Sequence, residues 1–402
     1  MTLSKSGPAE AVQSSERVST LELFFDLVFV FTVTQLTAAI AHDLDLTGIS
    51  RMVVMLAVIW WMYSGYVWLT NAVPPDTALR RCLLMVGMTG FLVVSLAIPH
   101  AFVDNDSATA FGWGYLVVTL VHTAMFAVSG ASRAAIARIA PFNIGSAVLV
   151  VLGAFLTDLP QIAMWAAAAT LQIVAPHLTD AMKFPLTARH FVERHGLVVV
   201  IALGESVIAI GAGAQLLDLD LTLIATAVLT IMLAFALWWA YFGTDDEAHT
   251  VARMEALPPR QRNLRALTVY GYGHYALLLG ILLFSAGVKS AVAHPADRLD
   301  AAQACALAGG LALFLATNVA TRLTFGISPN RYRVGAVLSL AATIPLGMLA
   351  SALAEVAAIV AVLTVAGVME EQRYPDPDPE AGAAGTGEPP AATGEVRRWR
   401  RG

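Results

Sequence analysis

Hydrophobic residues come in long runs along most of the chain, and short polar segments separate each run from the next. An α-helix needs about 20 such residues to cross a bilayer, and about 17 is the usual minimum. Twelve runs are candidate membrane spans, namely Leu21–Ala41, Met52–Thr70, Cys82–Ala101, Phe111–Ser129, Phe142–Leu156, Gln161–Ala175, Gly196–Ala214, Leu221–Phe242, Ala266–Val288, Ala302–Leu323, Val334–Ala350 and Leu353–Val368. The fifth and sixth runs are short, and the eleventh and twelfth are barely separated. Each of these pairs could instead be one broken helix or a re-entrant hairpin, leaving ten or eleven spans.

The distribution of basic residues favours twelve spans. If the N-terminus is cytoplasmic, twelve spans place 21 of the 24 lysines and arginines on the cytoplasmic side, and only Arg51, Lys289 and Arg298 on the other. Positive charge is enriched in cytoplasmic loops. Removing one span would reverse the sides of all later loops, so the pattern predicts twelve spans with both termini in the cytoplasm.

The composition is typical of an all-α membrane protein. Hydrophobic residues make up 57% of the chain and charged residues 13%, whereas a soluble domain has about 25% charged residues. Cys82 and Cys305 show no CxxC spacing, which indicates neither a zinc site nor a disulfide framework. We therefore predict a polytopic transmembrane helical bundle.

The motifs that the sequence lacks exclude several classes of partner. The chain has no phosphate-binding loop, no metalloprotease motif and no basic-aromatic pattern for nucleic acid outside its C-terminal tail. We expect no cofactor, no bound metal and no nucleic-acid partner. The expected partners are membrane lipids and a proton, small ion or solute, and the sequence leaves the oligomeric state open.

The polar ends of the chain define its predicted regions. Residues 1–20 form a polar cytoplasmic tail, and residues 21–369 form the transmembrane domain, with halves 21–176 and 195–369. Residues 370–402 are rich in Pro, Gly, Ala and Glu, which predicts a disordered cytoplasmic tail with a basic end.

Two matches between the halves predict an internal repeat. Trp-Trp-x-Tyr at residues 60–63 recurs at residues 238–241, and Asp26 of the first span matches Glu205 of the seventh at nearly the same offset. Six spans per half is an even number, so the repeat would be parallel, about an axis along the membrane normal. Aromatic pairs are common at membrane interfaces, and coincidence is the alternative explanation.

Two carboxylates within the first span are candidates for function. An ionised carboxylate at the bilayer centre costs a few kcal/mol, so such groups are usually protonated, paired or exposed to water. Glu22 and Asp26 are four residues apart and share one helix face. Glu22 could simply cap the helix or pair with Arg17. Asp26 lies deeper, and it either serves an ion path or fixes helix packing through a buried hydrogen bond.

Further candidates lie near the middle of other spans. Glu205 lies roughly 13 Å into the seventh span, with Ser206 beside it. His122 and His274 lie at mid-depth in the fourth and ninth spans. Histidine can relay protons near neutral pH, although a lone intramembrane histidine more often makes a packing hydrogen bond. Two histidines and two carboxylates at similar depth favour an ion or proton path.

Two pairs of motifs resemble the bacterial low temperature requirement A (LtrA) family. The first pair is Glu22-Leu-Phe-Phe-Asp-Leu-Val-Phe-Val-Phe31 with Thr34-Gln35-Leu36, and the second is His190-Phe-Val-Glu-Arg-His-Gly196 with Ile201-Ala-Leu-Gly-Glu-Ser-Val207. The resemblance covers nearly the whole membrane region and leaves the tails aside. It implies a multi-pass protein of the bacterial inner membrane, associated with growth in the cold. It supplies no settled activity and no set of catalytic residues.

The leading hypothesis is a secondary transporter or ion-translocating protein. Asp26 and Glu205, one from each half, would line a central path, with His122 and His274 as relays. One alternative is a membrane-embedded enzyme that uses the carboxylates as acid and base on a lipid or small molecule. The absence of a recognisable nucleophile or metal-ligand motif disfavours it. The other alternative is a non-catalytic scaffold or sensor for cold adaptation, in which the polar groups hold the helices together.

Overall fold

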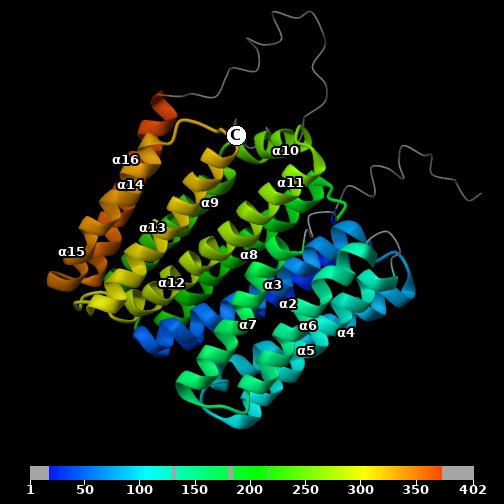
Figure 1. Ribbon diagram of the computed structural model, residues 1–402. Helices are drawn as coiled ribbons and strands as arrows, with labels where there is room; N and C mark the ends of the chain where they lie inside the picture. The colour runs from blue at the N-terminus through cyan, green and yellow to red at the C-terminus, as the bar shows by residue number, and fades with distance from the viewer. Residues whose placement is uncertain (1–17, 129–132, 180–183, 216, 374–402) are drawn as a thin grey trace, which may run out of the picture.

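The computed structural model of the protein describes residues 18–128, 133–179, 184–215 and 217–373 (Figure 1). Every secondary-structure element in these ranges is helical. Twelve helical segments are long and apolar enough to cross a membrane, which confirms the predicted class of a twelve-span helical bundle. The segments are α2 (Thr20–His42), α3 (Leu46–Ala72), α4 (Ala78–Ala97) with η1 (Ile98–His100), α5 (Asn105–Val128), α6 (Arg133–Gly153), α7 (Asp158–Leu178), α8 (Ala188–Ala214), α9 (Leu221–Phe242) with α10 (Asp246–Glu255), α11 (Pro259–Ala266) with η2 (Leu267–Gly273) and α12 (His274–Ala293), α13 (Ala301–Thr324), α14 (Arg331–Leu340) with η3 (Ala341–Thr343) and α15 (Ile344–Leu349), and α16 (Ala352–Arg373).

Polar residues in the short connections start several of these helices. Ser19 and Glu22 form a capping box at the start of α2, in which each side chain bonds the other residue's backbone N–H. Asp45, Thr77 and Asp220 accept backbone N–H bonds at the starts of α3, α4 and α9. The first turn of a helix leaves such donors without intrahelical partners. The polar separators therefore determine where the helices begin.

The fifth and sixth spans are longer than their hydrophobic runs. Helices α6 and α7 have 21 residues each, which is enough to cross a bilayer. Helix α6 already begins at Arg133, and α7 continues to Leu178. Counting apolar residues alone missed these ends, because charged and polar residues at a membrane interface can continue a helix.

Two other predicted boundaries are wrong for the same reason. Helix α8 begins at Ala188, eight residues before the run that starts at Gly196. Helix α16 continues to Arg373, so residues 370–373 are helical and do not belong to a disordered tail. Residues 1–17 of the predicted N-terminal tail, which include Arg17, and residues 374–402 of the predicted C-terminal tail lie outside the described residues.

The ninth and eleventh spans are interrupted helices. The ninth contains the π-helical segment η2, and the eleventh contains the 3-10 turn η3. A π segment departs from the usual backbone pairing, and here the indole of Trp60 donates to the carbonyl of Gly271 at 2.7 Å. The eleventh and twelfth spans are separate helices joined by a short connection, so they are not one long broken helix.

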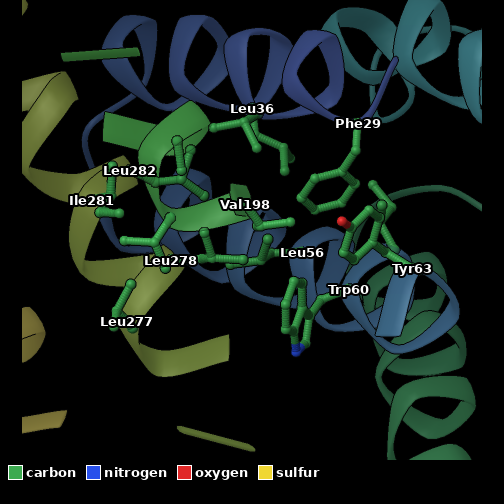
Figure 2. Close-up of a cluster of buried hydrophobic side chains, with 14 of the residues drawn as sticks. Phe29, Leu36, Leu56, Trp60, Tyr63, Val198, Leu277, Leu278, Ile281 and Leu282 are labelled. Carbon is green, nitrogen blue, oxygen red and sulfur yellow. The ribbon is translucent and has the colours of Figure 1, made fainter. Parts of the chain in front are cut away.

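Helices α2, α3, α8 and α12 pack together in the core. Figure 2 shows part of this cluster, which contains Phe29 and Leu36 of α2, Leu56, Trp60 and Tyr63 of α3, Val198 of α8, and Leu277, Leu278, Ile281 and Leu282 of α12. Because α2 and α3 belong to the first six spans and α8 and α12 to the last six, this cluster joins the two halves of the chain.

The helix pairs in contact in the first half correspond to those in the second. Each of the following contacts in the first half has a counterpart in the second half. These pairs of contacts are α2–α4 and α8–α12, α4–α5 and α12–α13, α5–α6 and α13–α14, α6–α7 and α14–α16, and α3–α7 and α9–α16. Gly90 faces Gly114 where α4 meets α5, and Gly280 faces Gly310 where α12 meets α13. Small residues allow this close approach of helix backbones. The correspondence is what a parallel repeat would produce.

The aromatic motifs that suggested the repeat differ in their surroundings. Trp60 is buried, whereas Trp238 and Trp239 are exposed on α9. The repeat therefore stays a prediction, supported by the order of helix contacts and not by the tryptophans.

Single-cysteine labelling tests the predicted orientation. With Cys82 and Cys305 replaced by alanine, Asp218→Cys should react with a membrane-impermeant thiol reagent in intact cells, whereas Asp76→Cys should react only after permeabilisation. These positions lie in the connections after the seventh and second spans, on opposite sides of a twelve-span protein. Labelling of Asp76→Cys in intact cells would contradict a cytoplasmic N-terminus.

Candidate functional site

A buried arginine joins α2, α3 and α8 near the ends at which α2 and α8 begin. Arg194 of α8 is 1% exposed. Its Nη1 lies 2.9 Å from Glu22 Oε1, and its Nη2 lies 2.6 Å from Asp26 Oδ1. The hydroxyl of Tyr63 donates to the same oxygen of Asp26 at 2.6 Å. A buried guanidinium requires counter-charges, and the two carboxylates on one face of α2 supply them.

Hydrogen bonds at the edge of this cluster orient its histidine. His190 Nε2 lies 3.3 Å from Glu22 Oε1, and His190 Nδ1 lies 3.2 Å from the amide nitrogen of Asn71. The Asn71 amide is oriented by the backbone of Thr187, from which it accepts a bond and to which it donates one. Its nitrogen therefore faces His190 Nδ1 as a donor, and the other ring nitrogen, Nε2, faces Glu22 Oε1.

The cluster places two carboxylates around one guanidinium. Glu22 accepts hydrogen bonds from the N–H and hydroxyl of Ser19 in addition to its ion pair. The second oxygen of Asp26, Oδ2, is buried and has no hydrogen-bond partner among the described residues. A net charge in an apolar interior is unfavourable. The arrangement can therefore take up one proton, and Asp26 Oδ2 is the position left open for it.

Glu205 forms a second polar contact between α2 and α8, deeper in the bundle. Its Oε2 accepts a hydrogen bond from the Thr34 hydroxyl at 2.5 Å, and the residue is 3% exposed. In the described part of the chain, no basic side chain forms an ion pair with it, and Lys289 of α12 acts only by a longer-range Coulomb interaction. Thr34 lies about 12 Å along α2 from Asp26. The two matched acidic residues therefore share one interface but differ in depth.

His274 lies beside a second histidine, His195, which directly follows Arg194. The ring centroids of the two histidines are 5.3 Å apart. Each Nδ1 faces a backbone carbonyl, and His274 Nε2 lies 2.8 Å from the Tyr241 hydroxyl. A carbonyl can only accept, so both Nδ1 atoms carry hydrogens. His195 Nε2 is buried without a partner among the described residues, and its lone pair can accept a proton.

A narrow crevice leads to this pair of histidines. Tyr241 and His274 line it together with Asp246, Glu247 and Arg322. The centre of a water molecule can occupy about 30 Å³ of it, and one water needs roughly 10–15 Å³ by this measure. The crevice thus has room for about two waters between charged residues of α10 and α13 and the histidines.

Charged residues also tie the helices of the second half together beside this crevice. Arg322 Nη1 lies 2.6 Å from Asp246 Oδ2, and Arg333 Nε lies 3.0 Å from Glu370 Oε2. Arg333 also donates to the side-chain oxygen of Asn318 at 2.6 Å. Glu370, placed by the sequence in a disordered tail, is thus a structural residue that fixes the end of α16.

The two remaining candidate residues lie apart from the charged cluster. His122 is in the first half, with its Nε2 3.1 Å from the carbonyl of Gly65. The Ser206 hydroxyl lies 3.1 Å from that of Ser285 on α12, which is a contact between packed helices. The structure therefore does not bring His122 and His274 together as neighbouring relays.

Several residues of the site are absent from the candidates that the sequence suggested. Arg194 and His195 were placed in a loop because the hydrophobic run begins at Gly196. The spacing of His190 and Arg194, four residues apart, is a helical signal that could have found them. Glu355 was overlooked within the last hydrophobic run; it is fully buried, and neither carboxyl oxygen has a partner in the described part of the chain.

Comparisons with known proteins cover most of the chain. The family model for the bacterial low temperature requirement A protein (LtrA) matches residues 17–368. An uncharacterized protein of Rhizobium meliloti (strain 1021) is 26% identical over 310 residues, which cover 73% of this chain and 74% of that relative. No solved structure matches the chain. Among the described residues, no group of three or more His, Cys, Asp or Glu residues is arranged to hold a metal ion.

A double-mutant cycle tests whether Arg194 holds α2 against α8. Arg194→Gln leaves two buried carboxylates without a counter-charge, so we expect the free energy of unfolding in detergent to fall by about 3–5 kcal/mol. The double variant Arg194→Gln/Asp26→Asn should be destabilised by less than the sum of the single changes, because the two side chains interact.

The matched control for this cycle is Arg80→Gln. It removes an ion pair with Asp76 that is largely exposed, and such pairs contribute about 0–1 kcal/mol. If the effects of Arg194→Gln and Asp26→Asn on the free energy of unfolding were additive, the two side chains would not be energetically coupled.

Proposed function

The chain belongs to the bacterial low temperature requirement A family, and we propose that it is a secondary transporter that moves protons, or a solute coupled to protons. It is an integral membrane protein with twelve helices able to span a bilayer. We place it in the bacterial inner membrane with both termini in the cytoplasm, on the basis of its basic loops. The observation that carries the proposal is that the interface between α2 and α8 buries ionisable groups at two depths.

Buried ionisable side chains are energetically unfavourable in a membrane protein, and they are typical of ion paths. Ionisable side chains inside membrane proteins mark proton relays and substrate paths. In transporters built from two similar halves, the binding sites lie at the interface between the halves. If these groups only held the helices together, one carboxylate would be enough to pair with Arg194. Here two carboxylates, Glu22 and Asp26, share its guanidinium. Glu205, in addition, has only a hydroxyl group as its direct partner among the described residues.

Protonation of Asp26 could couple proton binding to a movement of α8 relative to α2. A proton on Asp26 would remove one of the two negative charges that attract Arg194, and the ion pair at 2.6 Å would weaken. The contact between α2 and α8 would loosen as a result. Movement of α8 relative to α2 can then depend on whether a proton is bound.

The crevice beside α10 suggests how protons reach the interior. Waters in the crevice would contact Tyr241 and His274, and His274 lies against His195. A neutral histidine with a free lone pair accepts a proton on one nitrogen and releases another from the opposite nitrogen. Glu247, at the outer part of the crevice, would attract protons and other cations.

An apolar layer separates these groups from Glu205. Glu205 follows His195 by ten positions on α8, which corresponds to about 15 Å of helix. Phe29, Leu56 and Val198 fill this part of the interface (Figure 2). The proposed path is therefore closed in this conformation, and transport requires a second conformation in which the layer opens.

Proton flux into liposomes tests the proposal at Glu205. In wild-type proteoliposomes, a membrane potential should drive proton entry, measured with an enclosed pH-sensitive dye. Glu205→Gln preserves side-chain size and can still accept the bond from Thr34, but it cannot titrate. We expect flux to fall to that of empty liposomes while the unfolding temperature stays close to wild type. Glu255→Gln, at the exposed end of α10, is the matched control and should retain flux.

The same experiment discriminates between an ion path and a purely structural role. Normal flux through Glu205→Gln would exclude Glu205 from the path. If Glu205 only holds α2 against α8, Glu205→Gln should be nearly silent in all assays and Glu205→Leu should lower stability instead.

A further inference from the structure

We propose that the first half of the chain contains a second, separate site, which binds a small uncharged organic molecule carrying a hydroxyl or N–H donor. The site is a cavity between α3, α5, α6 and α7, away from the α2–α8 contact, and Leu267 of η2 also lines it. Its walls are largely aromatic, and include Trp61 and Trp68 of α3, Phe126 of α5, and Phe184, which precedes α8.

Two residues that line this cavity each carry a buried hydrogen-bond acceptor that has no partner among the described residues. His122 and Asn143 line it and are 4% and 3% exposed. His122 Nε2 lies 3.1 Å from the carbonyl of Gly65, so Nε2 carries the ring hydrogen and Nδ1 is an acceptor. His122 Nδ1 and Asn143 Oδ1 are both unpartnered within the described part of the chain. Buried polar atoms are usually satisfied, so these two indicate a missing partner that supplies donors.

Two helices that border the cavity contain an internal proline. Pro176 of α7 lines the cavity, and Pro141 lies inside α6, two residues before Asn143. A proline within a helix removes a backbone hydrogen bond and bends the helix. The centre of a water molecule can occupy about 70 Å³ of the cavity, several times the roughly 10–15 Å³ that one water needs. This space suits one small organic molecule.

The lining determines the chemical class of the ligand. None of the described residues that line the cavity is an aspartate, glutamate, lysine or arginine, so a charged ligand would lie there without a counter-charge. Aromatic walls suit a flat apolar body, and a few convergent polar atoms suit its orientation. A water molecule could bridge His122 and Asn143, but it would leave most of the space against apolar walls empty.

Ligand-observed fluorine NMR with 4-fluorophenol tests this site in the purified full-length protein. The phenol combines a flat apolar ring with a hydroxyl donor, so it should bind and show line broadening that excess unlabelled phenol reverses. Fluorobenzene has the same ring without the donor and should bind at least tenfold more weakly, because the buried acceptors would remain unsatisfied. The 4-fluorobenzylammonium cation should not bind detectably.

Variants locate the binding within the cavity. Asn143→Leu keeps the side-chain size but removes the acceptor, and should weaken 4-fluorophenol binding at least tenfold. Ile139→Trp, on the cavity wall, should block binding by filling the space, and it decides the question if Asn143→Leu does not fold. Gln172→Leu is the matched control, because it removes a buried amide of the same half that is not among the lining residues.

Three outcomes would overturn the proposal. Failure of 4-fluorophenol to bind the wild-type protein would indicate a cavity that holds only water. Equal affinity for 4-fluorophenol and fluorobenzene would show that the two acceptors do not recognise a donor. Unchanged binding by Asn143→Leu, or by Ile139→Trp, would place the molecule elsewhere on the protein.

Discussion

A guanidinium group buried between helices needs negative charge within reach, and Arg194 imposes this requirement on the packing of three helices. Glu22 and Asp26 satisfy it from one face of α2, and Tyr63 of α3 completes the contact through Asp26. A buried ion pair of this kind contributes little net stability compared with apolar packing, but loss of one partner is very unfavourable. Its main consequence is therefore specificity: α2 and α8 are held together in one register.

The same arrangement leaves ionisable groups in the α2–α8 interface that are not required for helix packing. The cluster places two carboxylates around one guanidinium, and Asp26 Oδ2 has no partner among the described residues. Deeper along the interface, the hydroxyl of Thr34 is the direct partner that the described residues supply to Glu205. The apolar layer between the histidines and Glu205 keeps the two polar levels apart in this conformation. A change in protonation at either level would alter the attraction between the helices that join the two halves, which links proton binding to movement.

Hydropathy and charge predicted the number and order of the helices, because lipid exposure and loop charge are properties of single segments. The face shared by Glu22 and Asp26 was likewise predictable from a spacing of four residues. The partner of these two carboxylates was not predictable, because the sequence does not show which helix packs against α2. Arg194 was further concealed by being counted as a loop residue. The offset that matches Asp26 with Glu205 does not identify contacts, because contacts between α2 and α8 join residues about 170 positions apart, as in Asp26 with Arg194 and Thr34 with Glu205.

Infrared difference spectroscopy can show whether Glu205 gains and loses a proton inside the bundle. Spectra of the protein in lipid, recorded between acidic and alkaline pH, resolve the carbonyl stretch of a protonated carboxyl group in apolar surroundings. We expect such a band in the wild-type protein, a shift of the band in heavy water, and its loss in Glu205→Gln. A spectrum of Glu205→Gln identical to that of the wild-type protein would contradict this expectation.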